Sequence, residues 1–199
     1  MIKQRLLSLL IFVLFAAQIV AQQTELFRNP IKIYNLGLEY FDKELYSAAQ
    51  KKFDEVGEIN GNDNTEVSTN AEYFSALCAL KLFHRDASLT MREFIRKHPE
   101  SSKIRDAKFH LGGYYYRKRK WNDVLKWYEQ VNPYDLSKNE QYEYKFKIAY
   151  SYLMKKDYDK AARGFYEIKD VNNSYSDPSR YYFAHISYLK ENYQTALTD

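Results

Sequence analysis

The chain has 199 residues, of which 45% are hydrophobic, 28% charged and 17% aromatic. This content of core-forming residues excludes a disordered chain, and the charged fraction excludes a bundle of membrane helices. Six glycines and four prolines are too few for the many tight turns of a β-sandwich. The length fits one domain or one short repeat array, and the composition favours helix.

Residues 1–21 have the features of a secretory signal peptide. Lys3 and Arg5 precede an apolar run that is shorter than the roughly 20 residues needed to span a bilayer. We expect cleavage after Ala21, an N-terminal extension over residues 22–29, and a soluble mature protein without a transmembrane segment. The expected location is the periplasm of a Gram-negative bacterium, or otherwise outside the cell.

Charge is unevenly distributed along the chain. Without the signal peptide, 28 basic side chains face 26 acidic ones, and this small excess does not suggest a nucleic-acid binder. Residues 22–80 carry a net charge of −5, residues 81–126 one of +8 and residues 127–199 one of −1. The middle segment is therefore a candidate for contact with anionic partners. Cys78 stands alone, so we expect no internal disulfide and a small buried side chain.

An internal repeat runs through the chain. A large apolar residue precedes a small one at Leu36-Gly37, Phe74-Ser75, Leu111-Gly112, Ile148-Ala149 and Phe183-Ala184. Nine residues after each small residue comes a ring, at Tyr46, His84, Trp121, Tyr158 and Tyr193. Three further on lies Ala49, Ala87, Val124, Ala161 or Ala196. Apolar residues recur at spacings of three and four within each unit, which predicts a pair of amphipathic helices. Such pairs bury their apolar faces by stacking on one another.

The expected helices follow from this register and from capping signals. First helices are expected near residues 30–42, 69–83, 102–117, 138–154 and 178–189. Second helices are expected near residues 46–58, 87–97, 121–131, 158–170 and from 193 onward. The capping signals are Asn29-Pro30, Asp86, Ser137 with Glu140, Asp157 and Asp177-Pro178. The array thus covers residues 30–199 with about five hairpins, of which the last is incomplete, and we expect the chain to be part of a longer repeat protein.

This pattern resembles the tetratricopeptide repeat (TPR) family. The matching residues are Gly37, Tyr40, Ala49 and Phe53, and again Ala149, Tyr152, Ala161 and Phe165. The resemblance implies an all-α fold, a right-handed superhelical stack of antiparallel helical hairpins known as a TPR-like α-solenoid. The signal peptide and the segment from Phe94 to Ser101 are similar to envelope and periplasmic repeat proteins of Gram-negative bacteria. The segment from Gln23 to Gln50 is similar to large repeat proteins of the Bacteroidota.

The sequence shows no pattern of catalysis or metal binding. The four histidines have no metal-ligand spacing, and no nucleophile elbow or phosphate-binding loop is present. We therefore expect a protein that is not an enzyme and that holds no cofactor or metal. Its function is expected to lie in binding.

A tyrosine-rich groove is the first candidate binding surface. In the TPR family the first helices line the concave face, and the register places there Tyr34, Phe41, Phe109, Tyr116, Phe146, Tyr150, Tyr181, His185 and Tyr188. Tyrosine offers a large rigid contact area with a polar tip, which suits recognition. The alternative is that several of these rings pack between repeats. The Lys and Asn residues with which some family members clamp a terminal carboxylate are absent from these places, so binding of chaperone tails is not expected.

A run of four basic residues is the second candidate: Arg117, Lys118, Arg119 and Lys120. It is expected at the turn inside the third hairpin, where a charge run is commonly only solvated. Its functional interpretation is a contact with acidic protein, anionic lipid or glycan. The sequence thus predicts a non-catalytic scaffold of the cell envelope that binds a protein or peptide through the groove. The alternative is an envelope-associating structural module that contacts polyanions through residues 81–126.

Overall fold

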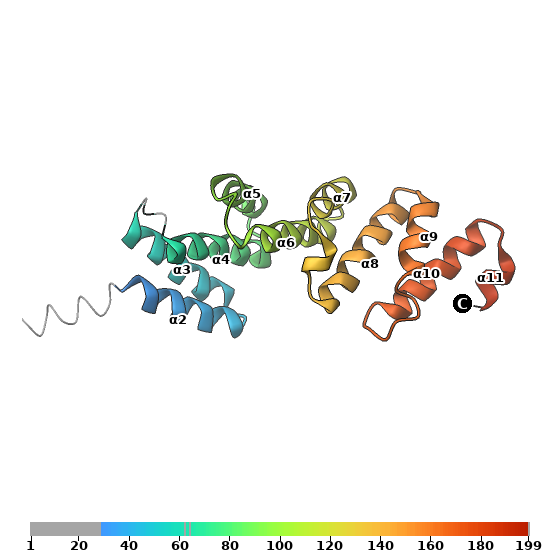
Figure 1. The fold of residues 1–199 in the computed structure, drawn as a ribbon, viewed down its shortest axis with the longest axis horizontal. Coiled ribbons are helices and arrows are strands. Elements are labelled where there is room, and N and C mark those ends of the chain that lie inside the picture. Colours follow the sequence, from blue (N-terminus) through green and yellow to red (C-terminus); the bar gives the residue numbers. More distant parts are fainter. Residues whose placement is uncertain (1–28, 62, 64, 199) are drawn as a thin grey trace, which may run out of the picture. The chain divides into compact units, whose positions relative to one another are not determined.

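A computed structural model describes residues 29–61, 63 and 65–198 (Figure 1). The expected signal peptide and nearly all of the expected extension lie outside these residues. All regular secondary structure in the described part is helical. None of the helices described is long and apolar enough to cross a membrane. The chain divides into two compact units, Met1–Leu82 and Phe83–Asp199, and each is treated by itself.

The first unit contains α2 (Pro30–Asp42), α3 (Tyr46–Asn60) and α4 (Glu66–Leu82) (Figure 1). The side chain of Asn29 accepts hydrogen bonds from the backbone N–H groups of Ile31 and Lys32, and Pro30 occupies the first turn of α2, as the sequence predicts. Helix α3 packs against both α2 and α4. Their common core consists of Ile33, Ala49, Phe53, Val56, Ala71 and Cys78. Cys78 is fully buried, as expected, and this burial raises the pKa of its thiol to about 12.

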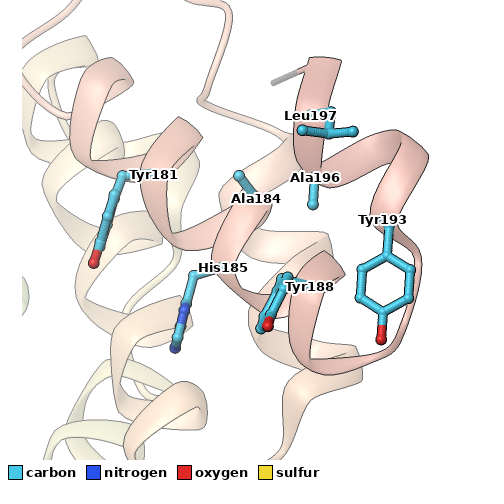
Figure 2. Close-up of a pocket in the computed structure, with 7 residues that line it drawn as sticks. All are labelled: Tyr181, Ala184, His185, Tyr188, Tyr193, Ala196 and Leu197. Carbon is cyan, nitrogen blue, oxygen red and sulfur yellow. The ribbon is translucent and has the colours of Figure 1, made fainter.

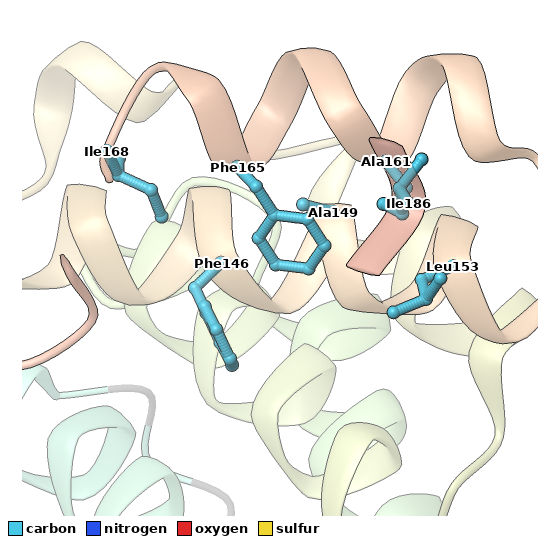
Figure 3. Close-up of a cluster of buried hydrophobic side chains, with 7 residues drawn as sticks. All are labelled: Phe146, Ala149, Leu153, Ala161, Phe165, Ile168 and Ile186. Carbon is cyan, nitrogen blue, oxygen red and sulfur yellow. The ribbon is translucent and has the colours of Figure 1, made fainter. Parts of the chain in front are cut away.

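The second unit contains α5 (Ala87–Lys97), α6 (Ile104–Arg117), α7 (Trp121–Tyr128), η1 (Pro133–Asp135), α8 (Lys138–Met154), α9 (Tyr158–Tyr166), α10 (Ser176–Leu189) and α11 (Tyr193–Thr198). Helices α6 and α7, α8 and α9, and α10 and α11 pack in pairs. Figure 3 shows the core between α8 and α9, made of Phe146, Ala149, Leu153, Ala161, Phe165, Ile168 and Ile186. Ile186 comes from α10, so the core of one hairpin is completed by the next.

Most helix boundaries agree with the expected ranges. Helices α2, α5 and α8 have the bounds that the sequence predicts. Helices α7 and α9 end earlier, and the chain continues in tighter turns in which the N–H of Val131 donates to the C=O of Tyr128 and that of Ile168 to Phe165. These turns keep apolar residues near helical spacing, which is why the apolar pattern predicts both helices to be longer than they are. The expected pairing of residues 69–83 with 87–97 stays a prediction, because α4 and α5 belong to different units.

Inside the second unit, three of the expected capping residues stand directly before their helices, and the pair Asp177-Pro178 does not. Ser137 and Glu140 form a capping box, and the Asp157 side chain accepts a hydrogen bond from the N–H of Lys160. Asp86 precedes α5 as expected, but its side chain makes no capping hydrogen bond. The pair Asp177-Pro178 lies inside the first turn of α10, which starts at Ser176. The turn before it is made instead by Asn173, whose side chain accepts from the N–H of Tyr175 at 2.7 Å.

Small residues bring the paired helices close together. A Cβ atom on Gly37 would lie 2.6 Å from Cε1 of Phe53, which no side chain could tolerate without a shift. In the second repeat this position belongs to Ala76, which is fully buried, and not to Ser75, whose hydroxyl donates to Asp54 at the protein surface. The repeat register that the sequence predicts is therefore one residue too early in this repeat, because Phe74-Ser75 also has the pattern of a large residue before a small one.

A residue with positive φ closes each predicted hairpin, and none of them is glycine. They are Glu44, Phe83, Arg119, Lys156 and Glu191, with φ between 56° and 63°, and each stands seven residues after the small residue of its repeat. At Arg119 the N–H donates to the C=O of Tyr116, and the next N–H donates to the C=O of Tyr115. This is the hydrogen-bond pair of the Schellman motif, which ends a helix with a left-handed residue. The turns at Glu44, Lys156 and Glu191 have the same pair.

Candidate functional site

Two of the expected groove residues are core residues. Phe109 is 4% exposed and its ring stacks on that of Tyr128, with the centroids 5.7 Å apart. Phe146 is 8% exposed and lies against the ring of Phe165 at 5.6 Å. Both rings fill space between helices and leave almost no surface for a partner. Their assignment to an open groove is therefore corrected.

Four further groove residues pack between neighbouring hairpins. In the first unit, Tyr34 and Phe41 contact the ring of Phe74 in α4, with centroids 6.1 and 5.3 Å apart. In the second unit, Tyr116 of α6 and Tyr150 of α8 meet edge to face at 5.6 Å. Burial raises the pKa of Tyr116. For these four residues the structure agrees with the alternative that the rings pack between repeats.

The remaining three groove residues are accessible and lie together on α10. Tyr181 and Tyr188 are 65% and 61% exposed, and His185 lies between them on the same face (Figure 2). With residues of α11 they line a pocket of about 440 Å³, which we call the aromatic pocket. Its lining residues are Tyr181, Ala184, His185, Tyr188, Tyr193, Ala196 and Leu197.

Ring contacts shape the aromatic pocket. The rings of Tyr181 and His185 are nearly parallel, with centroids 6.3 Å apart. Tyr188 meets Tyr193 edge to face at 5.6 Å, and Leu197 is 84% exposed on the opposite helix. The sequence reasoning missed Tyr193 and Leu197 as surface residues, because the repeat pattern gives the ring after each turn an inward position. The pocket offers apolar surface with a few polar tips, which suits the side chains of a protein partner.

The aromatic pocket has a covered counterpart in the fourth hairpin. Tyr181 and Tyr188 stand 35 residues after Phe146 and Leu153, which are 8% and 7% exposed. Phe146 is covered because Tyr175, next to the start of α10, lies 5.1 Å from its ring. The same face of the fifth hairpin has no helix over it in the part of the chain that the structure describes. Residues at the same place in two successive repeats thus differ in exposure among the described residues.

The four consecutive basic residues, which we call the basic tip, lie at the turn between α6 and α7, as expected. All four are exposed. The guanidinium carbon of Arg117 lies 4.4 Å from the ring centroid of Phe83, and the Lys118 ammonium lies 5.0 Å from it. Arg119 and Lys120 line a second pocket of about 320 Å³ with Trp121, Asn122, Asp123 and Lys155. The basic tip is thus a cationic surface with an aromatic support.

Among the residues that the structure describes, no group of three or more His, Cys, Asp or Glu side chains is placed to hold a metal ion. The ionisable groups near the aromatic pocket are tyrosines and His185. No acid, base and nucleophile converge there in the way that catalysis requires.

Comparisons with known proteins bear on the fold. No protein-family model matches the chain, and no curated protein matches it in sequence. The fold is similar to the crystal structure of a Podosopora anserina protein described as a kinesin light chain with nearly identical TPR-like repeats, with a TM-score of 0.64, 11% identity, and coverage of 85% of this chain and 92% of that chain. The crystal structure of a single-residue variant of that protein gives a TM-score of 0.63 and 11% identity, covering 84% of this chain and 89% of that chain. The chain therefore has an all-α fold of TPR-like repeats, as the sequence predicts.

Proposed function

We propose that this protein is a non-catalytic scaffold of the cell envelope that binds another protein through the aromatic pocket. One observation carries the proposal: Tyr181, Tyr188, Tyr193 and Leu197 are all more than half exposed and converge on one apolar hollow. Exposed apolar patches of this kind mark interaction sites. Tyrosine is also enriched among the residues that dominate binding energy.

The proposed location rests on the sequence alone. The basic residues and apolar run of residues 1–21 have the order of a signal peptide. Export into the periplasm would bring the scaffold to other envelope proteins. Intact-mass measurement of the exported protein tests this, and a mass that begins at Gln22 is expected. A mass that retains Met1 would contradict export through a cleaved signal peptide.

Affinity capture from envelope extracts tests the binding function. Replacing Tyr181 and Tyr188 together by serine should abolish capture of the partner while the melting temperature stays unchanged, since both side chains are exposed. A matched control is Leu89→Ser, because Leu89 is an exposed apolar residue of the same unit, on α5. Equal capture by the wild type and the double tyrosine variant would overturn the proposal.

The basic tip supports a second candidate function, contact with a polyanion. The observation that favours it is the stacking of Arg117 and Lys118 on Phe83, which holds two cations side by side at the surface. Binding to vesicles that contain anionic lipid should then weaken steeply as salt is added, because exposed charges are screened. Replacing Lys118 and Lys120 by glutamine should remove this binding. Capture through the aromatic pocket should persist at high salt.

A further inference from the structure

The second pocket, beside the basic tip, is lined mainly by charged residues, and we call it the cationic pocket. Arg119 and Lys120 come from the turn between α6 and α7, and Lys155 directly follows α8. All three residues are exposed. The other lining residues are Trp121, Asn122 and Asp123. Three cations and one carboxylate give the lining residues a net charge of +2.

No carboxylate among the described residues pairs with these cations. The Lys155 ammonium donates a hydrogen bond to Oδ1 of Asn122, which is an uncharged amide oxygen. Arg119, Lys120 and Lys155 form no ion pair with Asp123 or with any other acid in the part of the chain that the structure describes. Like charges that share a hollow repel one another, so an anion bound there would lower the electrostatic energy.

The junction between the fourth and fifth hairpins holds a carboxylate where the cationic pocket holds an amide. Counted from the small residue of each repeat, Lys190 corresponds to Lys155 and Asp159 corresponds to Asn122. Lys190 and Asp159 form an ion pair. The contact between neighbouring turns is therefore kept in both junctions, but only the later junction supplies its lysine with a negative charge.

A second carboxylate of the later junction is also replaced at the cationic pocket. Asp157 holds the position that corresponds to Lys120, and its carboxylate pairs with Lys160 at 3.1 Å. Asp123 holds the position of Lys160, and it pairs with no base among the described residues. The later junction thus contains its own paired anions. The cationic pocket has the donors for an anion but lacks a carboxylate that pairs with them.

We propose that the cationic pocket binds a phosphate monoester group. The proposal rests on the second candidate function, contact with a polyanion, and names the group that is recognised. A phosphate monoester carries close to two negative charges at neutral pH, which matches the net charge of the lining residues. The Arg119 guanidinium and the ammonium groups of Lys120 and Lys155 supply donors for its three terminal oxygens. A carboxylate would leave one positive charge uncompensated.

Trp121 gives the cationic pocket an apolar wall that is fixed in place. Its ring meets the rings of Tyr116 and Tyr150 edge to face, with centroids 5.7 and 5.6 Å apart. Lysine and arginine side chains adjust around an anion, whereas a ring held by two others keeps its position. The wall is placed to contact the carbon atoms next to the phosphate, so an organic ester fits this pocket better than inorganic phosphate does.

Three probes test the chemistry of the group and its source. Monoethyl phosphate is a soluble monoester, diethyl phosphate is the matched diester, and dihexanoyl phosphatidic acid below its micelle concentration is a lipid monoester. Each is titrated into the full chain by isothermal titration calorimetry. We expect both monoesters to bind saturably and more tightly than the diester. Equal affinity for the two monoesters assigns the ligand to a soluble ester, and tighter binding of phosphatidic acid assigns it to a lipid headgroup.

Three variants that each lower the net charge by one locate the binding. Lys155→Gln removes a cation of the pocket, and Asn122→Asp introduces the carboxylate that pairs with Lys190 in the later junction. Both should weaken monoester binding by about tenfold or more, as for loss of a charge-assisted hydrogen bond. Lys126→Gln is the control, because Lys126 is an exposed residue of α7 outside the pocket, and its effect should stay below about twofold.

Several results would overturn the inference. They are equal binding of monoester and diester, wild-type affinity of Asn122→Asp, and no binding of any probe. If all three variants weaken binding equally, the charge of the whole surface attracts the anion and the pocket selects nothing. In each of these cases the contact with polyanions stands as long as vesicles that contain anionic lipid still bind in a salt-dependent way. If that binding is absent as well, the second candidate function is also wrong.

Discussion

The ring of Tyr128 occupies the place where Gly112 lacks a side chain. A Cβ atom on Gly112 would lie 2.5 Å from Cδ1 of Tyr128, and the ring itself is fully buried. The same relationship joins Gly37 to Phe53 in the first hairpin. In each of these two hairpins, the first helix has a glycine where the aromatic ring of the second helix packs against it.

Replacing Gly112 by alanine should therefore lower the free energy of unfolding by about 1 to 3 kcal/mol, because the new methyl group overlaps a ring that has no space to move into. Gly57→Ala is the matched control. It lies inside α3 with nothing within 4 Å of a new Cβ atom, so stability should rise by about 0.5 to 1 kcal/mol. Urea denaturation measures both. A neutral Gly112→Ala variant would contradict this close packing of glycine against ring.

Tyr128→Phe should leave stability unchanged or raise it. The Tyr128 hydroxyl is buried, and no hydrogen-bond partner for it lies among the described residues. Leaving a buried polar group unsatisfied costs about 1 to 3 kcal/mol, whereas phenylalanine keeps the ring. Phe53 and Phe165 hold the corresponding positions in two other hairpins. A clear loss of thermal stability would show that the hydroxyl makes a favourable interaction.

The fold should lose stability at alkaline pH. Burial raises the pKa of six tyrosines in the second unit above the ordinary value of 10.0: Tyr114, Tyr116, Tyr128, Tyr144, Tyr175 and Tyr182. Because the folded pKa is the higher one, the stabilisation is complete below the unfolded pKa and is lost as the pH rises through the folded values. Phenolate absorbance should therefore rise together with the loss of helical circular dichroism. Ionisation of all tyrosines near their ordinary pKa without unfolding would contradict their burial.

The stabilisation that the capping box of α8 provides should weaken at acidic pH. Burial alone would raise the pKa of Glu140, but hydrogen bonds from the backbone and hydroxyl of Ser137 outweigh it, and the pKa is lowered. This contribution is present above the unfolded pKa and is lost as the pH falls through the folded one. Ser137→Ala should cost about 1 kcal/mol at neutral pH and less at low pH. A difference between variant and wild type that does not depend on pH would show that Glu140 takes no part.

The sequence predicted the hairpins well because their determinants are local. Apolar spacing, the caps at Asn29 and Ser137, and the small residues at Gly37 and Gly112 all act within a few turns of the chain. The binding face was predicted less well. Phe146 and Tyr181 occupy the same place in their repeats and differ in exposure only because a following helix covers the first. The exposure of this position depends on the helix that packs over the repeat, so a residue pattern shared by all repeats could not predict it.

The left-handed turns inside the hairpins limit where the chain can accept an insertion. A turn that must place one residue at positive φ seven positions after the small residue cannot accept an insertion without rotating the second helix away from the first. The loops that join successive hairpins carry no such constraint and already differ in length and content, as η1 between α7 and α8 shows. A tag, a protease site or a fluorophore loop inserted after Asp63, an exposed residue between α3 and α4, should thus be tolerated, whereas the same insertion at Lys156 should split its hairpin.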